Sequence, residues 1–167
     1  PPPFTAPPPP PPPSTALPPP PSTSVKFPFS MPTPAQQTLR CLDNCTQLKT
    51  WLATSGKRKR GDSLPTGTYL LHKVKEWLTT TAEGLAWMDA AGVNRDAYSV
   101  DHVFSQTLSV VDHLANYHLM PSGVNSYFNK VNIFDSKEKQ AYVGKQQTER
   151  TMSLIRRGMA SVDWPSL

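Results

Sequence analysis

The sequence has little cysteine and no long apolar run. Cys41 and Cys45 are the two cysteines among 167 residues, too few for a disulfide framework and without the second pair that a structural zinc site needs. We therefore expect reduced thiols on one face of a helix. No apolar run reaches the roughly 18 residues of a membrane span, so no membrane span is expected. We predict an intracellular protein. The chain begins with proline, so a preceding segment or targeting signal stays open.

The charge balance is basic, with 17 Lys and Arg residues against 12 Asp and Glu residues and a sequence pI near 9.3. Such a balance is compatible with a polyanionic partner such as nucleic acid. The densest basic run is Lys57–Arg60, inside a turn-rich segment. It fits a nuclear import signal, a phosphate contact or a solvated charge run, and the sequence leaves these three open.

Proline is concentrated at one end, because residues 1–34 hold 17 of the 20 prolines. Proline lacks the backbone donor that helices and central strands require. Residues 1–34 are therefore predicted to form a disordered, extended arm. The arm reads either as a tether or as a docking peptide for an SH3-like or WW-like domain.

The rest of the chain is predicted to be α+β and mostly helical. Apolar residues recur every three or four positions in several segments, which is typical of amphipathic helices. The predicted helices cover residues 39–52, 70–78, 80–92, 135–142 and 146–157. We divide the chain into the arm (1–34), a helical region (35–97), a central unit (98–134) and a C-terminal helical extension (135–167).

The central unit has a different pattern. Residues 98–103 and 116–121 are two short strand candidates, and the eleven residues between them, 105–115, form a long connection. Loops of this length tend to be functional or irregular. Residues 122–131 follow as a helix, with Ser122 as a possible N-cap. The predicted order is strand, irregular loop, strand, helix.

Four polar residues occupy particular places in that order. Asp101 and His102 end the first strand, Asn116 begins the second, and Asn125 lies on the helix. This pattern resembles the HNN form of the HNH nuclease family, which has a small ββα-metal centre. The resemblance covers about residues 98–131. Many members of that family also carry paired CxxC zinc knuckles, which this chain lacks.

The resemblance implies an endonuclease that hydrolyses DNA, in preference to RNA, with one Mg²⁺ or Mn²⁺ ion. Asp101 and Asn125 would bind the ion, because hard cations prefer oxygen ligands. His102 and Asn116 would be the catalytic members. His102 would take a proton from water, and Asn116 would hydrogen-bond backbone across the loop and hold His102 in place. Since neighbouring strand residues face opposite sides, a twist or bulge is expected to bring Asp101 and His102 together.

Three alternatives stay open at this point. His102, His113 and His118 would bind zinc if the loop folded back. The unit would also suit a module that grips nucleic acid without cutting it, or a helical scaffold whose proline-rich arm carries the function. In the nucleic-acid readings, basic residues after the motif would neutralise phosphates, and the candidates are Lys130, Lys145, Arg150, Arg156 and Arg157.

Overall fold

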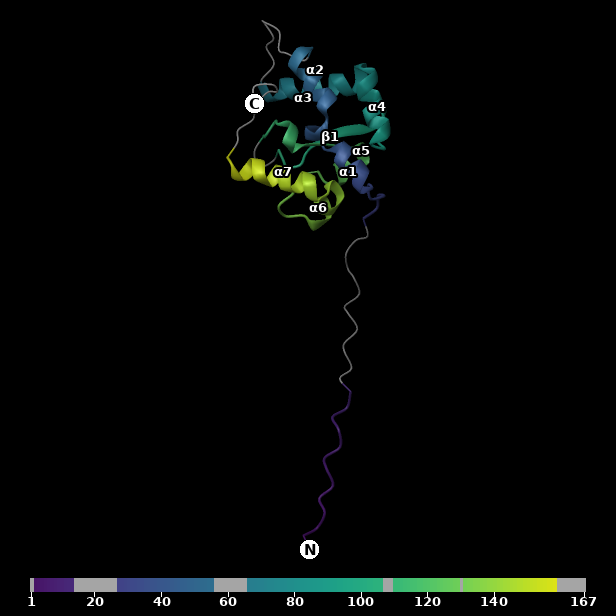
Figure 1. The fold of residues 1–167 in the computed structure, drawn as a ribbon, viewed down its shortest axis with the longest axis vertical. Coiled ribbons are helices and arrows are strands. Elements are labelled where there is room, and N and C mark those ends of the chain that lie inside the picture. The colour runs from purple at the N-terminus through teal and green to yellow at the C-terminus, as the bar shows by residue number, and fades with distance from the viewer. Residues whose placement is uncertain (1, 14–26, 56–65, 107–109, 130, 159–167) are drawn as a thin grey trace.

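The computed structural model describes residues 2–13, 27–55, 66–106, 110–129 and 131–158. Within these ranges it has seven α-helices and one two-stranded antiparallel sheet, which confirms the prediction of a mostly helical α+β fold (Figure 1). None of the described helices combines the length and apolar character needed to cross a membrane. The predictions for Lys57–Arg60 and Lys130 fall outside the described residues.

The first helical segment is broken. Helix α1 (Pro34–Arg40) starts at a capping box formed by Thr33 and Gln36, and a short 3-10 turn, η1 (Leu42–Asn44), separates it from α2 (Thr46–Thr54). The prediction of one helix over 39–52 is therefore wrong. The backbone is extended at Cys41, which forms an isolated β-bridge with His118, so pairing with a distant strand overrides the local apolar periodicity.

Helix α3 (Thr66–Thr80) packs against both α4 (Ala82–Ala90) and α2. The helix predicted over residues 80–92 is α4, whose N-cap is Thr81, and the Thr81 side chain accepts from the Gly84 amide. A Cβ at Gly84 would overlap the Trp77 carbonyl oxygen. Glycine at this position therefore lets the two helices approach closely.

The sheet pairs β1 (Tyr98–His102) with β2 (Tyr117–Pro121) in continuous register, and Asp101 lies opposite His118. A 3-10 turn, η2 (Leu114–Asn116), precedes β2, and α5 (Ser122–Tyr127) follows it directly. One face of the sheet, including Val100 and Leu119, packs in the main core with α2, α3 and α4. The other face, including Met120, packs in a second core with α5 and α6.

Helices α6 (Lys137–Val143) and α7 (Lys145–Arg156) complete the structure, joined at Gly144, whose φ is +90°. Phe27 and Phe29 pack against the second core. The Phe27 ring stacks on the Phe128 ring with the two centroids 5.6 Å apart, and its centroid lies 5.5 Å from that of Phe29. The packed part of the chain therefore begins before the predicted boundary at residue 34. Phe27 and Phe29 bury apolar rings against the second core, which the prolines before them cannot do. Residues 2–13, in contrast, form no helix or strand, and Phe4 is fully exposed.

Candidate active site

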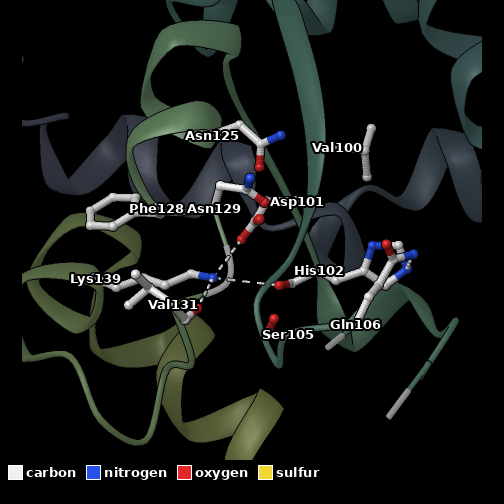
Figure 2. A pocket seen from close by; sticks show the side chains of 10 residues that line it. All are labelled: Val100, Asp101, His102, Ser105, Gln106, Asn125, Phe128, Asn129, Val131 and Lys139. Carbon is white, nitrogen blue, oxygen red and sulfur yellow. Dashed lines mark hydrogen bonds and ion pairs between the residues drawn. The ribbon is translucent and has the colours of Figure 1, made fainter. Parts of the chain in front are cut away.

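The carboxyl-terminal end of β1 lines a pocket of about 200 Å³, together with residues from α5, α6 and the segments that follow β1 and α5. The side chains around it come from segments far apart in the sequence (Figure 2). The lining residues are Val100, Asp101, His102, Ser105, Gln106, Asn125, Phe128, Asn129, Val131 and Lys139. Three of the four predicted motif residues, Asp101, His102 and Asn125, are among them.

Asp101 lies on the α5–α6 side of the sheet and is 9% exposed. Its Oδ2 atom forms an ion pair with Lys139 Nζ at 3.0 Å. Burial raises the pKa of the Asp101 carboxyl, and the neighbouring Lys139 ammonium offsets part of that rise.

Asn125 lies on α5 at the same pocket, and Asn129 lies one helical turn further along the chain (Figure 2). Among the interactions of the described residues, neither amide side chain makes a hydrogen bond or ion pair, nor does Asp101 Oδ1. The pocket therefore contains carboxylate and amide oxygens available to a ligand. These are the oxygen types that Mg²⁺ and Mn²⁺ prefer.

The imidazole of His102 points away from Asp101 (Figure 2). Its Nε2 atom lies 2.7 Å from Asp112 Oδ1, and the Tyr117 hydroxyl donates to the same oxygen at 2.6 Å. Burial by itself would raise the pKa of Asp112, but the hydrogen bonds from His102 and Tyr117 outweigh burial and lower that pKa. An ionised carboxylate only accepts hydrogen bonds, so the contact with Asp112 requires the proton on Nε2 and leaves Nδ1 as the basic nitrogen. The Gln106 amide nitrogen lies 3.2 Å from the same Nε2, and a hydrogen bond donated from it would require the opposite tautomer.

The expected twist or bulge that turns Asp101 and His102 toward one side is absent from β1, where pairing runs in unbroken register from Tyr98 to His102. The two side chains leave opposite faces of the strand, as ordinary alternation dictates. They share the pocket because both lie at the end of β1.

Asn116 is fully buried and connects both ends of the long loop. Its Oδ1 accepts from the Phe104 amide at 2.7 Å, and its Nδ2 donates to the Val111 carbonyl at 2.8 Å and to the Phe104 carbonyl at 3.4 Å. Phe104 follows His102 by two residues. The side chain is thus hydrogen-bonded to backbone across the loop, next to the segment that carries His102.

The three histidines of the zinc alternative have separate surroundings. His113 Nδ1 accepts from the Ala115 amide, and burial lowers the pKa of His113. His118 is fully buried, with Nδ1 3.2 Å from Gln147 Oε1, and no residue within the described ranges hydrogen-bonds to its Nε2. In the described part of the chain, no three His, Cys, Asp or Glu side chains form a group that could hold a metal.

The predicted basic contacts on α7 lie elsewhere. Arg150 pairs with Asp43 at 2.9 Å and lines a second pocket with Arg157, and Lys145 lines a third. Arg156 lies in the last turn of α7. None of these four residues lines the Asp101 pocket, so any contact they make with a polyanion would be outside it.

Sequence reasoning missed two charged residues of the site, Lys139 and Asp112. Lys139 shares the inner face of α6 with Tyr142 and Val143, and a lysine at helical spacing with such residues signals a buried charge. Asp112 follows two valines in an apolar stretch, which is a comparable signal.

The arrangement offers a carboxylate with a charge partner, two amide groups that make no hydrogen bond with the described residues, and an imidazole oriented by a second carboxylate. These groups are suited to binding a hard cation and to moving a proton. No protein-family model, curated protein or solved structure matches this chain.

Proposed function

We propose that the chain is a divalent-metal-dependent nuclease of the HNH type that hydrolyses phosphodiester bonds, with DNA as the preferred substrate. The observation that carries the proposal is the convergence of β1 and α5 on one pocket, lined by Asp101, His102 and Asn125. Asn116 supports it further, because it braces the loop behind His102 with three backbone hydrogen bonds.

Asp101 and Asn125 would hold the ion. Asp101 Oδ1 and the Asn125 amide make no hydrogen bond among the described residues, and both side chains line the pocket. Mg²⁺ usually keeps several waters, so two protein oxygens are a sufficient share. When bound, such an ion neutralises phosphate charge and stabilises the leaving oxygen.

His102 would act as the general base through Nδ1, because Nε2–H is directed at Asp112. The negative Asp112 carboxylate stabilises the imidazolium that forms when Nδ1 takes a proton from water. Since Asp101 and His102 face opposite sides of β1, the reacting phosphate would have to lie at the strand end, where both side chains are within reach.

A second candidate function is a module of the same kind that binds nucleic acid without cutting it. The specific observation in its favour is that both key side chains already have internal partners. Asp101 is paired with Lys139 and His102 with Asp112. Such pairing satisfies the buried groups without any ion or substrate.

A plasmid-nicking assay with Mg²⁺ or Mn²⁺ separates the two functions, and a calorimetric Mn²⁺ titration in the presence of a non-hydrolysable phosphorothioate DNA duplex identifies the ligands. We expect nicking by the wild type, loss of Mn²⁺ binding in Asp101→Ala, and retained or tighter binding in Asn125→Asp, which adds a carboxylate. Binding of DNA without nicking would favour the non-catalytic module. Unchanged Mn²⁺ affinity in Asp101→Ala would refute the proposed metal site.

A further inference from the structure

Lys139 is an unusual residue for the wall of this pocket, because it is a lysine with 1% exposure. Lysine is almost never fully buried unless its ammonium is paired. Its Nζ lies 3.0 Å from Asp101 Oδ2, 3.1 Å from the Val131 carbonyl oxygen and 3.4 Å from the His102 carbonyl oxygen (Figure 2). Three oxygens thus surround a group that has three protons to donate.

These contacts join three separate parts of the site. Asp101 and His102 belong to β1, Val131 follows α5, and Lys139 comes from α6. One carboxylate and two carbonyl oxygens around a positive centre are also the kind of oxygen set that surrounds a bound cation. The ammonium therefore stands where positive charge is needed, on one side of the Asp101 carboxylate.

We propose that Lys139 is a permanent internal cation of this pocket. It holds Asp101 and the end of β1 in place without metal, and it limits how tightly a divalent ion binds at Asp101 on its own. The second half of the proposal, the limit on divalent-ion affinity, rests on the proposed metal-dependent function. The first half, that Lys139 holds Asp101 and the end of β1 in place, does not.

The physical reason is charge balance. Among the described lining residues, Asp101 and Lys139 are the carboxylate and the ammonium, so their charges cancel. A divalent ion beside Asp101 would meet a carboxylate that is already neutralised and would be repelled by the nearby ammonium. A phosphodiester supplies the missing negative charge, so the ion is expected to bind together with substrate and only weakly without it.

The test compares the melting temperature and Mn²⁺ affinity of the wild type with those of Lys139→Met, Asp101→Asn and the double variant Asp101→Asn/Lys139→Met. Methionine keeps an unbranched side chain but removes the charge. Lys137→Met is the matched control, because Lys137 is exposed on the same helix. All variants are measured in EDTA and in Mn²⁺, as full chains.

In EDTA, Lys139→Met should melt about 10 °C or more below the wild type, because removing one partner strands a buried charge. The double variant should recover most of that loss, and Lys137→Met should behave as the wild type. Mn²⁺ should raise the melting temperature of Lys139→Met, since the ion can replace the ammonium. Its affinity for Mn²⁺ should exceed that of the wild type by at least about tenfold.

A Lys139→Met variant as stable as the wild type in EDTA would overturn the first half of the proposal. Equal or weaker Mn²⁺ affinity in a folded Lys139→Met would overturn the second half. If Lys139→Met does not fold, a folded double variant supports the pairing and an unfolded one contradicts it. Stabilisation of Lys139→Met by Mn²⁺ with no nicking by the wild type would refute the nuclease and leave the role of Lys139 standing.

Discussion

Replacement of Asn116 tests how the long loop is held beneath the pocket. Asn116→Ala removes an acceptor from the Phe104 amide and a donor to the Val111 carbonyl. Asn116→Asp keeps the shape and the acceptor but has no N–H to donate. The two variants therefore separate the loss of the whole side chain from the loss of its donor alone.

The expected magnitude follows from the groups left behind. The Phe104 N–H and the Val111 carbonyl would each lose a partner, at a cost of about 1–3 kcal/mol per group. We expect a total of about 3 kcal/mol, in the lower half of the summed range, because Phe104 is only partly buried and water can reach its amide. For a domain of this size, that corresponds to a fall in melting temperature of about 10 °C.

The aspartate variant should be at least as unstable as the alanine variant. It would bury a carboxylate oxygen against the Val111 carbonyl oxygen, with the Phe104 amide as its remaining donor, and a buried charge so poorly paired is costly. Melting temperatures from circular dichroism at neutral pH provide the measurement. Asn94→Ala is the control, because Asn94 is exposed and accepts only from the Asp96 amide in its turn. If Asn116→Ala melts within about 2 °C of the wild type, the loop does not depend on Asn116 and this reasoning fails.

Three further predictions concern other parts of the molecule. His102→Ala should lower the nicking rate about 10²–10⁴-fold with little change in DNA affinity, whereas His113→Ala should not; the reverse result would exclude His102 as the base. Phe27→Ala should lower the melting temperature by several degrees, because Phe27 contacts the second core, whereas deletion of residues 1–13 should leave it unchanged; equal effects would contradict the docking of Phe27. Burial lowers the pKa of His118 from 6.5 to about 3, so only the unfolded chain binds its proton as pH falls through that window. The free energy of unfolding should therefore drop by up to about 1.4 kcal/mol per pH unit below pH 6.5. Urea unfolding of the wild type and of His118→Asn at pH 7 and pH 5 measures this drop. If both proteins lose the same free energy of unfolding between the two pH values, His118 is not responsible.

Part of the candidate site could be predicted from the sequence because its residues are tied to local patterns. Asp101 and His102 were predicted at the end of a strand over residues 98–103, and the observed β1 ends at His102. The spacing of Asn125 placed it on the helix after the second strand, where α5 carries it. The partners of these residues were not predictable in this way, because Lys139 lies 37 positions from His102 and local periodicity carries no information about that contact.

By itself, the sequence determined the elements whose cause is local. Helical apolar spacing set α3, α4 and α7. The strand candidates 98–103 and 116–121 correspond to β1 and β2. Only the tertiary structure decided where those local preferences yield to burial and long-range pairing. It broke the first helix at Cys41 to pair with β2, packed Phe27 on the second core, and placed the Lys139 ammonium against Asp101. Each is a contact between distant segments, which forms because buried apolar area and buried charge must find partners wherever the fold provides them.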